Sequence, residues 1–294
     1  MRKLFLLSIM LLTALMVSAQ ITVSPKMKKG TKKTYIGETT TTIQGQKPIT
    51  LTMETLFEVT DVTSDGYIVD ITLKNVKSDA DPNDFTGHIF TLSSEMMKDI
   101  KTSYLTDKNG QVTKILNYEE VISNARKLVD KIFESVPLPQ GMSLDFVKEQ
   151  AFANMTEESL LKTVQINTNP MALNGKTIQT GKEEEYTLDK MGIKMKRTYT
   201  VNADGSVQAV STHNMQKEDI KELVTSMFEK FAPGQADMLK DQIDAAIANI
   251  KLEINDNTTY TFSSDGWVET LNSELSSTTI GPKTIAKTIL RLKK

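Results

Sequence analysis

The chain of 294 residues has no cysteine, only two histidines and one tryptophan. Without cysteine it can form no disulfide, no thiolate zinc site and no lipid-modified cysteine, so its fold must depend on packing alone. The two histidines, His88 and His213, lie far apart and outside the His-Glu-x-x-His spacing of metalloproteases. No Gly-x-Ser-x-Gly nucleophile motif occurs either. The sequence therefore predicts a protein that is not an enzyme, with no catalytic, cofactor-binding or metal-binding residue to name.

Two weaker chemical signals are also set aside. Gly175-Lys176-Thr177 ends like a phosphate-binding loop, but Pro170 stands where the first glycine belongs. Carboxylates are plentiful, yet no spacing singles out a pair suited to glycoside hydrolysis. We interpret Glu183-Glu184-Glu185 as the solvated start of a strand. A hydrolase that uses unmarked carboxylates remains an alternative.

Arginine is scarce after the first 19 residues: only Arg126, Arg197 and Arg291 follow. Two of the 35 basic residues and none of the 37 acidic ones lie in residues 1–19, so the remaining charge is 33 − 37 = −4. Proteins that read phosphates or bases are usually basic and rich in arginine. Nucleic acid is therefore not an expected partner.

Residues 1–19 have the pattern of a Sec signal peptide. Arg2 and Lys3 precede an apolar stretch from Leu4 to Val17, and Val17-Ser18-Ala19 forms a small-residue cleavage site. No later run approaches the ~20 apolar residues of a membrane helix, so no transmembrane span is expected in the mature chain. We predict export to the periplasm or to the outside of the cell. The alternative is an uncleaved N-terminal anchor.

The clearest structural pattern is a β-hairpin between Leu51 and Val76. Apolar and polar residues alternate on both sides of an Asp65-Gly66 turn, which is typical of antiparallel strands with one buried face. We predict that one set of side chains faces the core and the other faces water. The inward set is Tyr67, Val69, Ile71 and Leu73, and the outward set is Asp70, Thr72 and Lys74.

Further strands and helices follow the same kinds of pattern. Strands are predicted at 34–43, 104–105, 112–115, 182–188, 193–201, 207–209, 252–262, 267–276 and 284–292. Apolar stripes at helical spacing predict helices at 118–135, 143–165, 216–231 and 235–250, with a short one at 93–100. The fold class is α+β: a large, twisted, half-barrel-like antiparallel sheet packed on amphipathic helices, with room for two similar halves.

The order of these elements suggests a division of the mature chain. Residues 20–166 would form an N-terminal β-meander with helices, and residues 167–294 would form strands, a helix pair and further strands. Pro170, Gly175 and Gly181 mark a junction between the two. The two parts could also form one continuous domain.

Two charged segments have competing interpretations. Five lysines lie within Lys26–Lys33; we favour a charged, aggregation-resistant edge strand over a surface that attracts anionic lipid. Asp79, Asp81 and Asn83 have the opening spacing of a calcium loop, but the later glycine and glutamate positions are Asp84 and Phe90. We interpret this loop as a solvated turn and leave calcium binding open.

Several features together resemble a known group of proteins. They are the leader, the Lys-Lys-Gly-Thr-Lys-Lys-Thr-Tyr opening, the long Asp-Gly hairpin, the central helices and the restart at Asn174-Gly175-Lys176-Thr177. This layout resembles uncharacterised secreted or periplasmic Gram-negative proteins described as domains of unknown function. More distantly it is similar to the lipoprotein-carrier fold, which implies a curved antiparallel sheet around helices with an apolar cavity. No residue role is carried over.

The functional prediction combines this layout with the methionines. Twelve of the 15 follow the leader (15 − 3 = 12), and several lie near predicted helices, where they would first of all fill the core. We predict a non-enzymatic exported protein, without a cofactor, that binds an apolar ligand, a lipid or a lipid-bearing envelope protein between its sheet and helices. A structural or protein-interaction module with a packed interior is the alternative. The oligomeric state stays open.

Overall fold

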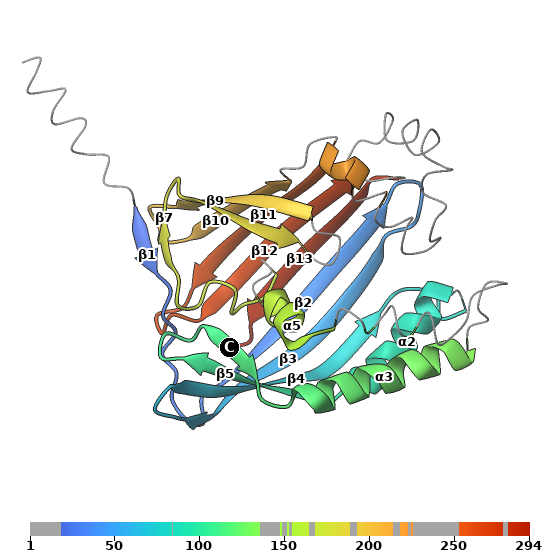
Figure 1. The fold of residues 1–294 in the computed structure, drawn as a ribbon, viewed down its shortest axis with the longest axis horizontal. Helices are drawn as coiled ribbons and strands as arrows, with labels where there is room; N and C mark the ends of the chain where they lie inside the picture. Colours follow the sequence, from blue (N-terminus) through green and yellow to red (C-terminus); the bar gives the residue numbers. More distant parts are fainter. Residues whose placement is uncertain are drawn as a thin grey trace, which may run out of the picture.

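Eleven strands form one continuous antiparallel sheet in the computed structural model, which describes residues 19–83, 85–135, 148, 152, 155–164, 168–188, 193–213, 218–222, 225, 253–278 and 282–294. The sheet is open and strongly curved, with β6 and β8 at its two edges (Figure 1). The predicted α+β class with a large antiparallel sheet is confirmed. In spatial order the strands are β6 (Val112–Ile115), β5 (Lys101–Asp107), β4 (Gly66–Ser78), β3 (Ile49–Val62), β2 (Lys32–Ile43), β13 (Thr284–Leu292), β12 (Val268–Thr278), β11 (Glu253–Phe262), β10 (Val207–His213), β9 (Ile193–Val201) and β8 (Glu183–Leu188).

The first and last strands of this sheet pair at its centre. The chain runs from β2 outward to one edge at β6, then enters the other edge at β8 and returns to the centre at β13. Strand β13 is antiparallel to β2, with Leu290 opposite Gly37. One sheet thus draws strands from both sides of residue 167, and the proposed boundary there stays a prediction.

The interpretation of the lysine-rich segment as an edge strand is wrong. Strand β2 has a neighbour on each side because β13 arrives from the other end of the chain, which local sequence does not reveal. Three of the lysines instead form ion pairs. Lys29 lies 3.0 Å from Asp61, Lys32 lies 3.1 Å from Glu58, and Lys33 lies 2.6 Å from Asp265.

Three helices have described bounds: α2 (Phe85–Met97), α3 (Tyr118–Ser135) and α5 (Glu157–Val164). Helix α3 has the predicted bounds, and α5 lies within the predicted 143–165. Helix α2 begins well before the predicted 93–100, because apolar residues recur at helical spacing from Phe85 onward. Residues 218–222 are helical; most of the predicted helices at 216–231 and 235–250, most of 143–156 and nearly all of the leader lie outside the described residues. No helix in the described ranges has the length and apolar character needed to span a membrane.

The main core lies on the inner, concave face of the sheet. It joins strand residues from the two ends of the sequence, such as Val69 and Tyr260, which are both fully buried. Among the described residues, those that cover it come mainly from two non-helical segments, Val23–Met27 and Met171–Ile178, whereas α5 contributes Val164. These segments are tied together by the short pairing of β1 (Gln20–Thr22) with β7 (Thr177–Gln179). Residues 167–181, predicted as a junction, thus carry side chains that pack in the core.

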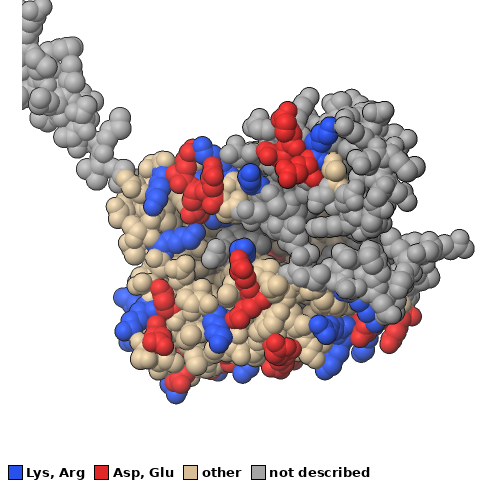
Figure 2. All heavy atoms as spheres, in the orientation of Figure 1, with Lys and Arg blue, Asp and Glu red and all other residues tan. Residues whose placement is uncertain are grey.

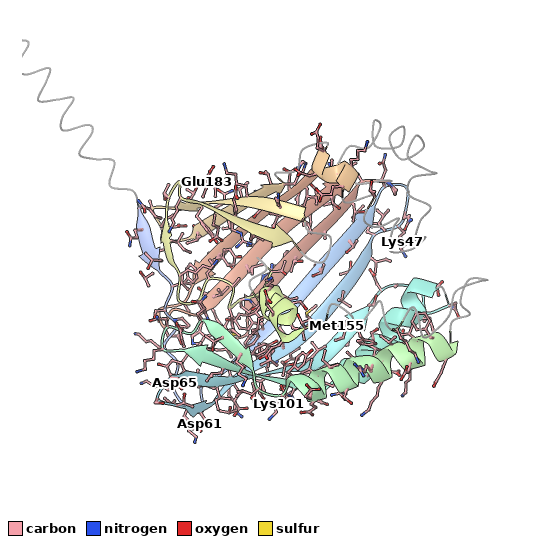
Figure 3. All side chains as sticks on the ribbon, in the orientation of Figure 1. Lys47, Asp61, Asp65, Lys101, Met155 and Glu183 are labelled. Carbon is pink, nitrogen blue, oxygen red and sulfur yellow. The ribbon has the colours of Figure 1, made fainter. Side chains whose placement is uncertain are left out.

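The predicted orientation of the first hairpin is correct for its apolar set. Val69 is fully buried in the core, and Tyr67 and Ile71 pack against it. The expectation that the opposite set faces water is wrong, since Asp70 and Thr72 are 8% and 9% exposed. Neighbouring β5 supplies the reason: Ser103 Oγ donates to Asp70 Oδ1 (2.7 Å), and Lys101 Nζ, labelled in Figure 3, lies 3.0 Å from Asp70 Oδ2.

Candidate functional site

Polar residues form a row across the inner face of the sheet. The strand register places Glu184 on β8 opposite Arg197 on β9, Arg197 opposite Ser211 on β10, and Ser211 opposite Asp256 on β11. Directly paired residues of adjacent strands point to the same face. Arg197 is 2% exposed and Ser211 is fully buried. A charged row is therefore built into the face that also holds the core.

Glu184 is the centre of the first part of this row. Its Oε1 accepts hydrogen bonds from Arg197 Nη1 (3.0 Å), Lys176 Nζ (3.2 Å) and the Tyr199 hydroxyl (2.5 Å). The Arg197 guanidinium also lies over the Tyr186 ring, 4.2 Å from its centroid. The interpretation of residues 183–185 as solvated holds only in part for Glu184, because its side chain points inward and is 33% exposed, whereas neighbouring Glu183 is exposed at the sheet rim (Figure 3).

The cluster shifts the pKa values of its members. Desolvation by burial acts to raise the pKa of Glu184, but the hydrogen bond from Tyr199 and the charges of Lys176 and Arg197 outweigh it, so the pKa lies below its usual value. Burial lowers the pKa of Lys176, and the Glu184 carboxylate opposes that change only in part. Burial raises the pKa of Tyr199, so its hydroxyl keeps its proton and remains a donor.

Replacing Glu184 by glutamine is expected to reduce the dependence of stability on pH in acid. A carboxylate whose folded-state pKa is lowered contributes stability above its unfolded pKa, about 4.5, and loses it as pH falls through the folded value. The loss of stability caused by Glu184→Gln should therefore be full near pH 7 and shrink as the pH falls below about 4.5. Urea unfolding at a series of pH values measures it.

The exposed Glu183 gives the control for this substitution. Its ion pair with Lys196 is between half-exposed side chains on the outer face, so Glu183→Gln should change stability by less than ~1 kcal/mol at neutral pH. Equal pH profiles for Glu184→Gln and the unaltered protein would contradict the assigned role of Glu184.

Asp256 is the second carboxylate of the row. Its Oδ1 accepts hydrogen bonds from Thr258 Oγ1 at 2.8 Å and from Ser273 Oγ at 3.1 Å, and the side chain is 9% exposed. Both inward carboxylates are therefore held by several donors. A polar network whose hydrogen bonds are all made favours one packing arrangement. If one donor moves away, the carboxylate that it bonded is left unpaired in a poorly solvated place.

The inner face is partly exposed to solvent where the row continues onto the central strands. Leu275 on β12 pairs with Asp256, Ala286 on β13 pairs with Leu275, and Thr41 on β2 pairs with Ala286. Leu275 is 37% exposed although it points to the core-bearing face. We call this surface the central strip. It comprises Thr39, Thr41, Leu51, Met53, Leu275, Ala286 and Thr288, and all except Leu275 are half-buried.

The hydroxyls of the central strip are partly paired with each other. Thr39 and Thr288 lie on adjacent strands with their Oγ1 atoms 3.0 Å apart. When two threonines on adjacent strands bond to each other through their hydroxyls, their methyl groups can still face a ligand. The strip therefore combines apolar area with a small and partly satisfied demand for hydrogen bonds.

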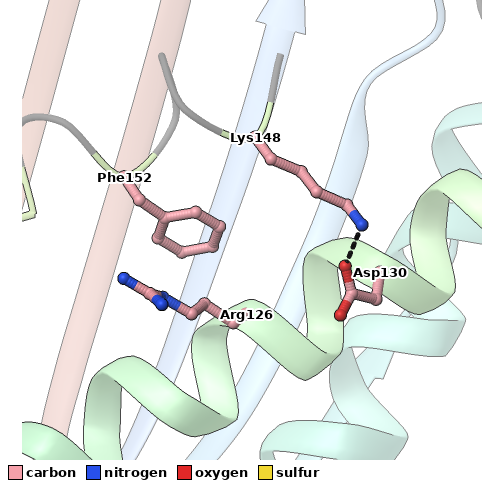
Figure 4. A pocket seen from close by; sticks show the side chains of 4 residues that line it. All are labelled: Arg126, Asp130, Lys148 and Phe152. Atoms are coloured by element: carbon pink, nitrogen blue, oxygen red, sulfur yellow. Dashed lines mark ion pairs between the residues drawn. The ribbon is translucent and has the colours of Figure 1, made fainter. Parts of the chain in front are cut away.

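A cavity of about 380 Å³ lies beside helix α3. Arg126 and Asp130 on α3 line it, together with Lys148 and Phe152 from the facing segment (Figure 4). Asp130 Oδ1 and Lys148 Nζ form an ion pair at 2.5 Å. The Arg126 guanidinium lies over the Phe152 ring, 5.5 Å from its centroid. The strands of the large sheet pass behind this cavity in Figure 4.

The residues noted for calcium are used by the loop itself. Asp79 Oδ1 accepts a hydrogen bond from the Thr50 N–H at 2.6 Å, and Asp81 Oδ1 accepts from the Asn83 N–H at 2.9 Å. These bonds are those of a capped turn. Within the described ranges no group of three or more His, Cys, Asp or Glu side chains is placed to hold a metal ion. Whether the loop binds calcium stays open.

The remaining candidates do not come together. His88 is exposed on α2, and His213 is half-buried at the end of β10. Among the described residues, the methionines buried in the core are Met27, Met171 and Met195, none of which lies on a predicted helix. Sequence reasoning missed the polar row, although one signal pointed to it: Arg197 occupies an inward position in the alternation of Ile193, Met195, Tyr199 and Val201.

Comparison with known proteins gives little. No family model matches the chain, and no match is found among curated proteins. Among solved structures, the chain is similar to lipovitellin, in a structure entitled "Lipid-protein interactions in lipovitellin", with 8% identity and a TM-score of 0.39. The alignment covers 92% of this chain and 26% of that one, so the chain spans about a quarter of lipovitellin's length. This likeness is too remote to assign a function, and the resemblance to the lipoprotein-carrier fold stays a prediction.

Proposed function

We propose that the protein is a non-enzymatic, exported binding protein that holds an apolar ligand, a lipid or a lipid-bearing partner against the central strip. The observation that carries this proposal is the 37% exposure of Leu275 on the same face whose neighbouring Leu271 is fully buried. A large apolar side chain that points to the core-bearing face and still meets solvent is informative, because that face normally buries its apolar residues.

The chemistry of the strip suits an apolar occupant. Leu51, Met53 and Ala286 surround Leu275 with apolar area, and methionine adapts its shape to different partners. The hydroxyls of Thr39 and Thr288 bond to each other, so the pair has one donor hydrogen rather than two to offer to another group. A polar ligand would find few donors or acceptors here, whereas an acyl chain would lose only water.

The distribution of charge also supports an uncharged contact surface. In the coloured part of the face shown in Figure 2, Lys and Arg atoms and Asp and Glu atoms are interspersed without a large field of one sign. Binding through long-range attraction needs such a field. The energy of association is therefore expected to come from burial of apolar area.

A substitution on the strip tests the proposal. Leu275→Gln should weaken the binding of a fluorescent fatty acid about fivefold to tenfold, because burying the exposed part of a leucine is worth ~1 kcal/mol. Val210→Gln is the matched control. Val210 is 40% exposed, but it neighbours Ser211 in β10 and so points to the outer face. Fluorescence titration measures both.

Equal weakening by the two substitutions would place the ligand elsewhere than on the strip. Native mass spectrometry of the full-length protein, purified gently from its own envelope, is a second measurement, and a co-purifying lipid mass is the expected result. An apo mass together with no binding of the probe would reject the proposal. The remaining possibility would then be the structural or protein-interaction module with a packed interior.

A further inference from the structure

The cavity beside α3 has an unusual balance of charge. The described residues of its lining hold two cations and one anion, Arg126 and Lys148 against Asp130, so their summed charge is 2 − 1 = +1, whereas the whole chain has a net charge of −2. Asp130 is four residues after Arg126 on α3, which is the spacing at which an arginine and a carboxylate pair on one helix. Asp130 instead pairs with Lys148 at 2.5 Å.

Among the residues that the structure describes, no carboxylate is paired with the guanidinium of Arg126. Among the described residues its recorded contact is with the face of the Phe152 ring, 5.5 Å from the centroid (Figure 4). A ring stacked on a guanidinium covers its flat face, whereas its N–H donors point outward in the plane. Those in-plane donors match the two oxygens of a carboxylate or phosphate. Arg126 thus brings donors suited to an anion to the lining of the cavity.

The size of the cavity limits what that anion can be. A volume of about 380 Å³ is at the lower end of ligand pockets, which are typically ~300–1,000 Å³. It accommodates a small head group with the first part of an attached chain. Phe152 supplies apolar area next to the charge, so the lining fits an anion that continues into a hydrocarbon.

We infer that the ligand is a single-chain anionic amphiphile whose carboxylate or phosphate binds Arg126 in this cavity, an inference that rests on the function proposed above. The in-plane N–H donors of Arg126 bind the head group in a bidentate manner. Phe152 holds the guanidinium in place and contacts the first methylene groups. Lys148, neutralised by Asp130, shapes the cavity and adds no second anchor.

The test compares dodecanoate with dodecanol, which has the same chain length and no charge. Isothermal titration should show that the unaltered protein binds dodecanoate about tenfold more tightly than dodecanol. Hydrogen bonds between charged groups are stronger than neutral ones by a free energy that corresponds to about a tenfold change in the dissociation constant. Arg126→Gln should remove the preference and weaken dodecanoate about tenfold, leaving dodecanol unchanged. Glutamine is a good helix former, so α3 should be retained, and circular dichroism checks this.

Lys127→Gln is the matched control, because Lys127 is the next residue of α3, is exposed and carries the same charge. It should change dodecanoate binding less than twofold. If Arg126→Gln binds dodecanoate as tightly as the unaltered protein does, the head-group site is rejected while the proposed function stands. If the unaltered protein binds neither compound, both fail.

Butyrate and inorganic phosphate separate a lipid head group from a free anion. Each presents the anionic chemistry without a long chain, and each should bind at least a hundredfold more weakly than dodecanoate, because each buried methylene group adds ~0.8 kcal/mol. Binding of either one at the strength of dodecanoate would make this a free-anion site and overturn the assignment to an amphiphile. Addition of salt should weaken dodecanoate and leave dodecanol nearly unaffected.

Discussion

Deletion of residues 284–294 is expected to leave the protein unfolded. These residues contain β13, a nine-residue strand that is hydrogen-bonded to β12 on one side and to β2 on the other. Each ladder bond contributes ~0.5–1.5 kcal/mol net, so both ladders together are of the same order as a typical domain stability of ~5–15 kcal/mol. The deletion also removes Leu290, which is 7% exposed in the core, and creates two new strand edges.

Circular dichroism during thermal unfolding measures the outcome: a cooperative transition should be absent. Removal of Lys293 and Lys294 alone is the control. It eliminates the ion pair between Lys293 and Glu54 (3.1 Å), the backbone hydrogen bond from the Lys293 N–H to the Thr34 carbonyl (2.7 Å) and the contact of Lys294 with Glu269 (3.5 Å), and it leaves β13 whole. A cooperative transition in the larger deletion would show that strands β2–β6 and β8–β12 fold without β13 between them.

Substitution of Arg197 by methionine is expected to destabilise the fold by ~2–4 kcal/mol. Methionine keeps most of the length of the side chain but leaves the Glu184 carboxylate with one cation instead of two and removes the contacts of Arg197 with Ser211 and Tyr186. Breaking a buried ion pair costs ~3–5 kcal/mol; the value is reduced here because the Glu184 side chain is 33% exposed.

Lys196→Met is the matched control for this prediction. Lys196 is the preceding residue on β9 and points outward, and its ion pair with Glu183 joins side chains that are 41% and 51% exposed. Exposed pairs contribute ~0–1 kcal/mol. Urea denaturation that finds equal effects for Arg197→Met and Lys196→Met would reject the cluster as a stabilising unit.

The elements that sequence predicted well are those defined by local patterns. The hairpin of β3 and β4, the second hairpin of β5 and β6, strands β9 and β13 and helix α3 all follow from periods of 2 or 3.6 and from turn residues such as Asp65-Gly66. Periodicity decides which face of an element is apolar, because side-chain direction repeats with the backbone geometry. The fold class follows from the order of such elements.

Those local patterns could not predict the pairing of β2 with β13. Residues 32–43 and 284–292 are separated by most of the chain, and neither segment contains a turn or a register signal that names its partner. The same limit produced the incorrect edge assignment of the lysine-rich segment. It also hid the covering of the core by residues 171–178, because a segment that lies between Pro170 and Gly181 and turns at Gly175 is locally indistinguishable from a surface loop.

The candidate site divides in the same way. Sequence alone determined an α+β chain with one apolar sheet face, no cysteine and scarce arginine, and it predicted export and an apolar ligand. Only the tertiary structure aligned Glu184, Arg197, Ser211 and Asp256 in a row, left Leu275 exposed beside it and separated Arg126 from Asp130. The physical reason is that alternation fixes the face on which a side chain lies, whereas its neighbours across the sheet depend on strand order and register, which are set by contacts distant in sequence.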